Sequence, residues 1–174
     1  MNLQTSDTAS LASLIRQIVS DIADAGTGDR AELRRLKPDD PGGAAFWSIV
    51  VRHLDPELPV GDRRDDALRR WAVILRALAT LTGLHNPGRR FGSVLAQAGV
   101  SEARLNKLLR VSGEALWDLV RAVTHQLSSA GMPVDLTGFA YMVLSDGRAN
   151  EQAVRQHIAN DYYDQIFRAE KETK

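Results

Sequence analysis

Hydrophobic positions along the chain recur at intervals of three and four residues, the spacing that gathers them on one face of an α-helix. The clearest stripes run from Leu11 to Ile22, from Leu68 to Ala79 and from Leu116 to Leu127. No segment shows the alternation of apolar and polar positions, rich in β-branched residues, that is typical of strands. The pattern therefore predicts an all-α protein of about eight helices.

Capping residues and chain breaks divide the pattern into individual helices. We expect helices over residues 9–25, 30–36, 41–54, 63–82, 112–129, 136–145 and 150–168, and two more within 91–110 that meet at Gly99. Asp29, Asp40, Ser101, Ser112 and Asp135 are the expected N-caps because their side chains accept hydrogen bonds from the first helical N–H groups. Trp47 and Trp71 fall on apolar stripes, so both are expected in the core.

The sequence "SSAGMP" at residues 128–133 is a clear break late in the chain. We expect it to separate a larger N-terminal helical bundle, residues 1–130, from a smaller C-terminal bundle, residues 131–174. The two bundles together would complete one compact chain.

The charge is balanced in total but unevenly distributed. The chain has 22 basic and 22 acidic residues. Residues 30–124 hold sixteen basic against eleven acidic residues, whereas both flanking segments are net acidic. Arginine outnumbers lysine by far and suits bidentate phosphate contacts, although a GC-rich coding sequence would explain the same bias. The basic middle favours a nucleic-acid backbone as a partner.

Several classes of protein are excluded by what the sequence lacks. There is no cysteine, which excludes disulfides, zinc fingers and cysteine catalysis and fits a reducing compartment. No apolar run approaches the roughly 20 residues of a membrane span, and no signal peptide is recognisable, so we expect the cytoplasm of a bacterium. The four histidines stand alone, and no nucleophile elbow or phosphate-binding loop occurs. We therefore expect no catalytic residue, no metal site and no cofactor.

The stretch "FGSVLAQAGVSEARLNKLLR", residues 91–110, has two interpretations. The turn at Gly99 and the inward positions after it match a DNA-reading helix-turn-helix. However, that motif needs a small residue four positions before the glycine, where Leu95 stands, and Ala96 is displaced by about 100° around the helix. The alternatives are therefore a helix-turn-helix transcription regulator or two ordinary bundle helices. In the second case Arg104, Lys107 and Arg110 could still form a stripe that contacts phosphate without reading bases.

Five blocks carry a resemblance to a known family. They are "AELRRL" (31–36), "FW" (46–47), "ALRRWAVILRALATL" (67–81), "GSVLAQAGVSEARLNKLLR" (92–110) and "LVRAVTHQL" (119–127). In this order they resemble CasB, the small subunit of the type I-E CRISPR surveillance complex Cascade, over roughly residues 10–165. The resemblance implies two helical bundles, no catalytic activity and a role in antiviral defence.

The resemblance also implies partners and site residues. The partners are the other Cascade subunits, a second copy of the chain arranged head to tail, the target DNA backbone and the guide RNA–DNA hybrid. The implied nucleic-acid-binding residues inside the matching blocks are Arg34, Arg35, Arg110 and Arg121. Those implied by position outside the blocks are Arg63 at the start of the long helix, Arg89, Arg90, and Arg148 in the turn before the last helix. Arg89 and Arg90 lie in a basic loop that is shorter here than in the family. Arg104 and Lys107 are added from the stripe alone.

Overall fold

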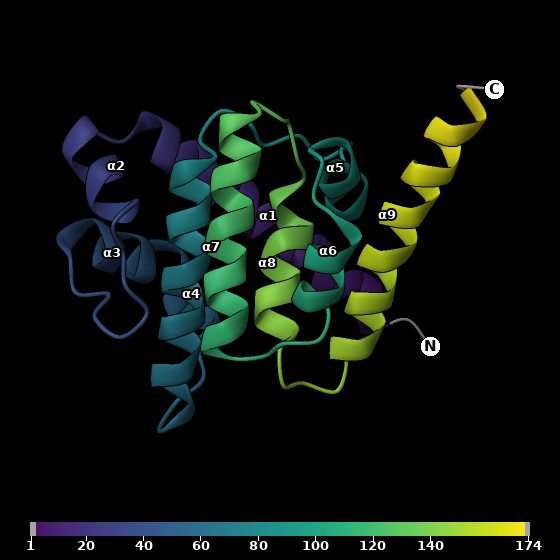
Figure 1. Cartoon of the computed structure of the whole chain (residues 1–174). Helices are drawn as coiled ribbons and strands as arrows, with labels where there is room; N and C mark the ends of the chain where they lie inside the picture. Colours follow the sequence, from purple (N-terminus) through teal and green to yellow (C-terminus); the bar gives the residue numbers. More distant parts are fainter. Residues whose placement is uncertain (1–2, 173–174) are drawn as a thin grey trace. The chain divides into compact units, whose positions relative to one another are not determined.

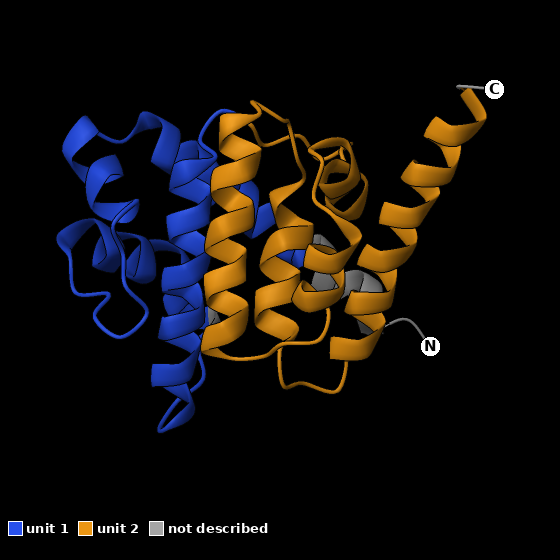
Figure 2. Cartoon of the chain, viewed as in Figure 1, with its two compact units in different colours: residues 1–83 blue, residues 84–174 orange. Residues whose placement is uncertain are grey.

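The computed structural model describes residues 3–172, and within this range it contains nine α-helices and no β-strand (Figure 1). The predicted all-α fold is therefore confirmed. The contacts divide the chain into two compact units, residues 1–83 and residues 84–174 (Figure 2).

Unit 1 consists of the first four α-helices and two short irregular helices. They are α1 (Leu3–Asp24), α2 (Thr27–Leu33), α3 (Ala44–Ile49), the π-helix η1 (Val50–Leu54), the 3-10 helix η2 (Asp55–Glu57) and α4 (Arg63–Thr80). α1 packs against α4, and α2 packs against α3 and α4. Ile15, Ile18 and Ile22 of α1 are buried, as are Trp71, Ile74 and Leu78 of α4. The prediction that Trp71 lies in the core is confirmed.

Two predicted N-caps in unit 1 are wrong. Asp29 lies inside the first turn of α2, whose N-cap is Gly26. α3 begins at Ala44 rather than after Asp40. The backbone N–H of Ala45 donates to the carboxylate of Glu32 at 2.8 Å, so an acidic side chain from α2 supplies the acceptor that a local cap would have provided.

Trp47 is 43% exposed, so its predicted place in the core is wrong. Consecutive helical residues point about 100° apart, and Phe46 already occupies the inward position with no exposed surface. Trp47 instead packs edge-on against Phe46, with the ring centroids 5.3 Å apart. The predicted single helix to residue 54 also changes at Val50 into the π-helix.

Unit 2 consists of the remaining five helices. They are α5 (Phe91–Gln97), α6 (Glu102–Leu108), α7 (Glu114–Ser129), α8 (Leu136–Ser145) and α9 (Glu151–Glu172). α5 packs chiefly against α9 and also against α8, α8 packs against α9, and α6 packs against α7. Because α8 and α9 pack on α5, the contacts group residues 131–174 with residues 84–130, which differs from the expected boundary at residue 130.

Backbone hydrogen bonds tie the chain across the "SSAGMP" break. The N–H of Val134 donates to the carbonyl of Leu84 at 2.8 Å, and the N–H of Asn86 donates back to the carbonyl of Val134 at 2.9 Å. The N–H of Asp135 donates to the carbonyl of Arg89 at 2.7 Å. The break therefore returns the chain to the loop before α5 instead of opening a separate bundle.

Three N-caps were predicted in unit 2, and two of them are confirmed. Ser101 accepts from the N–H of Arg104 at 3.3 Å, and Asp135 accepts from the N–H of Thr137 at 2.9 Å, so both predicted N-caps are confirmed. The predicted cap at Ser112 is wrong, because Gly113 is the N-cap of α7.

Candidate nucleic-acid interface

The two helices of residues 91–110 are joined at Gly99, whose φ of +71° suits glycine, but neither helix has the other as its main neighbour. α5 lies directly on α9: a Cβ placed at Gly92 would come 2.2 Å from the carbonyl oxygen of Ile158. Leu95 is fully buried, and α6 packs on α7. The structure therefore favours two bundle helices over a helix-turn-helix.

The basic stripe is shorter than predicted. Arg104 and Lys107 are exposed on α6, but the helix ends at Leu108. Arg110 lies beyond it in a turn, where its N–H donates to the carbonyl of Lys107 at 3.1 Å. The prediction that Arg110 continues a helical stripe is wrong, and its direction is set by the linker between α6 and α7.

Four of the ten predicted residues have exposed side chains with no hydrogen-bond or ion-pair partner in the part of the chain that the structure describes. They are Arg63 at the start of α4, Lys107 on α6, Arg110 after α6 and Arg148 in the turn before α9. Without partners, their N–H groups are available to a phosphate.

Four further arginines donate to neutral groups. Arg34 donates to the carbonyl of Ala79 at 2.9 Å, and Arg35 donates to the carbonyl of Ala31 at 2.9 Å. Arg104 donates to the amide oxygen of Gln126 at 2.7 Å, and Arg89 donates to the amide oxygen of Gln97. A neutral acceptor leaves the positive charge uncompensated, and a guanidinium has five N–H donors. These side chains therefore keep the ability to attract phosphate.

The last two predicted residues are ion-paired. Arg121 approaches Asp118 at 3.3 Å, and both side chains are largely exposed, so the pair is weak and can be exchanged for phosphate. Arg90 approaches Asp161 at 3.0 Å, and that carboxylate is only 7% exposed. Because an unpaired buried carboxylate is costly, the charge of Arg90 is largely committed to Asp161.

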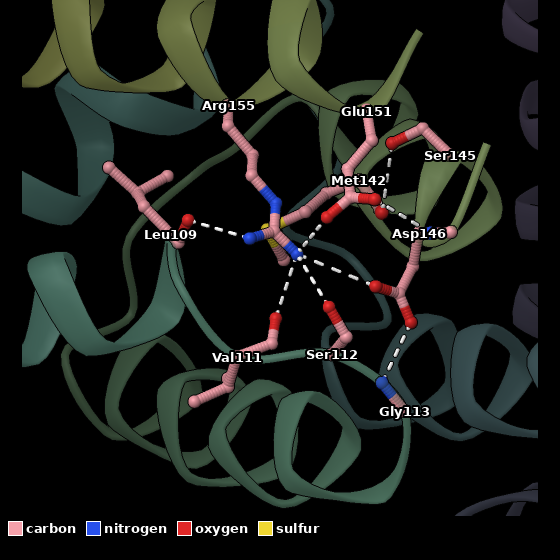
Figure 3. A network of polar contacts seen from close by, with 10 residues as sticks. Leu109, Val111, Ser112, Gly113, Met142, Ser145, Asp146, Glu151 and Arg155 are labelled. Atoms are coloured by element: carbon pink, nitrogen blue, oxygen red, sulfur yellow. Dashed lines mark hydrogen bonds and ion pairs between the residues drawn. The ribbon is translucent and has the colours of Figure 1, made fainter. Parts of the chain in front are cut away.

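Arg155 of α9 is absent from the predicted set, although it lies at the centre of a polar network (Figure 3). Its side chain is 12% exposed, and its guanidinium donates to the carbonyls of Leu109 at 2.7 Å and Val111 at 2.8 Å. Helical spacing indicates only its ion pair with Glu151, four positions earlier, and gives no signal for its backbone partners more than forty positions away.

Neither unit carries a net charge of more than one. Residues 1–83 hold eleven basic and twelve acidic residues, and residues 84–174 hold eleven basic and ten acidic residues. Attraction to a polyanion must therefore arise from local groups such as Lys107 and Arg110.

Two further properties concern the described residues alone. Among the side chains that the structure describes, no group of three or more His, Cys, Asp or Glu is placed to hold a metal ion. No helix in the described part of the chain is long and apolar enough to span a membrane.

Comparison with known proteins identifies the family. The model of the family described as CRISPR-associated protein Cse2 matches residues 29–163, more than three quarters of the chain. Comparison of the chain with curated proteins and with solved structures found no significant match. An all-α chain matched over this length falls in the class of CRISPR Cascade subunits. The chain belongs to the Cse2 family, which is that of the type I-E Cascade small subunit, and the resemblance seen in the sequence is confirmed.

Proposed function

We propose that this protein is the non-catalytic small subunit of a CRISPR RNA-guided DNA surveillance complex, acting in the cytoplasm, and that its basic side chains hold DNA strands to stabilise the R-loop. R-loop formation exchanges one duplex for another of similar stability, so contacts to the backbone can decide the balance. Such contacts should not read bases, because the guide RNA already supplies the sequence. Its proposed partners are the other Cascade subunits, a second copy arranged head to tail, the target DNA backbone and the RNA–DNA hybrid.

The observation that carries this proposal is that four of the predicted residues, Arg63, Lys107, Arg110 and Arg148, are exposed and have no partner among the described residues. A surface arginine that only improves solubility can equally well pair with a nearby carboxylate, as Arg64 does with Asp55. The balanced total charge also fits, since a strongly basic subunit would bind DNA by itself and compete with assembly.

The ten predicted residues should contribute unequally. We expect the largest contributions from the four unpartnered side chains, because binding phosphate costs them no existing contact. The four with neutral acceptors and Arg121 should follow. Arg90 should contribute least, because moving it away from Asp161 would leave a buried carboxylate without its closest cation.

The first test is assembly followed by charge reversal. The chain is co-expressed with the remaining Cascade subunits and a guide RNA, and its co-purification and copy number are measured. The affinity of the complex for target DNA is then measured over a salt series with Arg110→Glu and with Arg121→Glu. Each lost phosphate contact should lower the slope of log affinity against log salt by about 0.9.

Arg16→Glu is the matched control, because Arg16 is exposed on α1, has no partner among the side chains that the structure describes and is outside the proposed set. It should leave the slope unchanged. An unchanged slope with Arg110→Glu and Arg121→Glu in a fully assembled complex would contradict the proposal and favour a purely protein-binding adaptor. Enrichment of one sequence when the isolated chain is offered random DNA would instead support a helix-turn-helix regulator.

A further inference from the structure

We propose that Arg155 is a positioning residue that holds Arg110 and Arg148 on one fixed backbone frame, so that the two side chains bind the DNA backbone as a unit. This inference rests on the proposed function and deepens it.

Arg155 forms hydrogen bonds to the backbone on both sides of Arg110. Its guanidinium donates to the carbonyl oxygen directly before Arg110, at Leu109, and to the one directly after it, at Val111, at 2.7 and 2.8 Å. It also donates to the hydroxyl of Ser112 at 3.2 Å. The backbone of Arg110 is thus fixed while its side chain stays exposed.

The same network holds the turn that carries Arg148. Glu151 forms an ion pair with Arg155, and its other carboxylate oxygen accepts from the N–H of Gly147 at 2.8 Å. The N–H of Arg148 donates to the carbonyl of Ser145 at 2.9 Å, and its own carbonyl accepts from the N–H of Glu151 at 3.1 Å. The turn is therefore closed on both sides of Arg148.

Asp146 joins the two segments to each other. It is 3% exposed, and one carboxylate oxygen lies 3.4 Å from the guanidinium of Arg155. The other oxygen accepts from the N–H of Gly113 at 2.8 Å (Figure 3). The linker after α6 and the turn before α9 are consequently parts of one hydrogen-bonded frame, which ties the backbone of Arg110 to that of Arg148.

Arg155 itself is poorly suited to contact DNA. It is 12% exposed, and its N–H groups and charge are used by two carbonyls, a hydroxyl and two carboxylates. Its effect on binding should come from preorganisation, since side chains on a fixed frame lose less freedom when they bind. A lysine cannot replace it, because one ammonium lacks the planar fork that spans both carbonyls.

The experiment measures the affinity of the assembled complex for target DNA, with its salt slope, for Arg155→Met and Arg155→Lys. Each variant is tested alone and together with Arg110→Ala and Arg148→Ala. Alone, each should bind about 3- to 10-fold more weakly, as expected for residues that act on binding through others. Combined with the two alanines, neither should weaken binding further, because the side chains that they position are gone.

Controls separate this role from loss of fold. Arg70→Met removes an equally buried arginine, 12% exposed and ion-paired to Asp66, from the other unit, and should leave DNA affinity unchanged. Asp146→Asn keeps the size of the side chain and one acceptor oxygen, which is enough for the N–H of Gly113, but removes the charge and the second acceptor that face Arg155. It carries the same test if the Arg155 variants fail to assemble.

Two outcomes would overturn the inference alone. One is normal affinity of the assembled Arg155→Met and Asp146→Asn complexes, and the other is an equal loss with and without the two alanines. A third outcome is that the Arg110→Ala and Arg148→Ala pair by itself leaves the affinity for target DNA unchanged. This would overturn the proposed contacts of these two residues, and the inference with them.

Discussion

At the scale of the residue, the role of each arginine depends on what its guanidinium already binds. Arg63 and Arg64 are neighbours at the start of α4 and carry the same charge. Arg64 is ion-paired to Asp55, whereas Arg63 has no partner in the described chain. Sequence alone cannot separate them, because Asp55 approaches Arg64 through the fold and not through helical spacing.

This contrast gives a matched pair of variants. Arg63→Ala should lower the salt slope of target binding by the assembled complex by about 0.9, because one proposed phosphate contact is lost. Arg64→Ala removes the same formal charge but a side chain that is already paired, and should change the slope little. Equal effects of the two would mean that general charge, and not the unpartnered side chain, governs binding.

Asp21 provides a test of the structure that is independent of DNA. The hydrogen bond that His53 donates to it at 2.8 Å, aided by the charges of His53 and Arg52, holds the pKa of Asp21 below its ordinary value of 3.8 against the opposing effect of burial. A lowered carboxyl pKa stabilises the fold above the ordinary pKa, and this stabilisation is lost as the pH falls through the folded-state pKa.

Asp21→Asn should therefore reduce the free energy of unfolding near neutral pH, and the difference from the wild type should shrink as the pH falls below the ordinary value of 3.8 and through the lowered pKa of Asp21. Denaturant unfolding of the isolated chain at several pH values measures it. Asp24→Asn, at an exposed aspartate without a partner among the described residues, is the control. A difference that grows towards low pH would contradict the assigned hydrogen bond.

At the scale of the element, contacts between residues close in the sequence could be predicted, and contacts between distant parts of the chain could not. Ser101 and Asp135 are caps whose acceptors and donors lie within three residues, so the sequence was sufficient. The start of α3 could not be predicted, because its acceptor, Glu32, comes from another helix. The role of Arg155 was missed for the same reason: spacing indicates its pair with Glu151, but the carbonyls that it binds lie more than forty positions away.

The crossing of α5 and α9 depends on a glycine that the helix-turn-helix comparison did not consider. Gly92→Ala would place a Cβ 2.2 Å from the carbonyl oxygen of Ile158 and 2.8 Å from the Cβ of Asp161, so the helices must separate. We expect a loss of about 1–3 kcal/mol in the free energy of unfolding. Gly28→Ala, where no atom lies within 4 Å of the added Cβ, should be neutral or slightly stabilising in the same denaturation experiment. Equal stability of the two variants would contradict the close crossing.

At the scale of the whole molecule, the all-helical class and the family could be predicted from periodicity and from the order of a few sequence blocks. The division at Gly83 could not, because it depends on α8 and α9 packing on α5 across a break that looks like a domain boundary. The excess of basic residues in the middle of the sequence also disappears when the charges are counted separately in the two compact units. The proposed DNA-binding function therefore depends on a few local side chains and not on the net charge of either unit.

The most direct test of this function is the salt dependence of target binding by the assembled complex carrying Arg63→Ala, Lys107→Ala, Arg110→Ala and Arg148→Ala together. If these four side chains hold the DNA backbone, affinity falls and the slope decreases by up to about 0.9 for each lost contact. The same affinity and slope as the wild type, in a complex that retains the small subunit, would contradict the account.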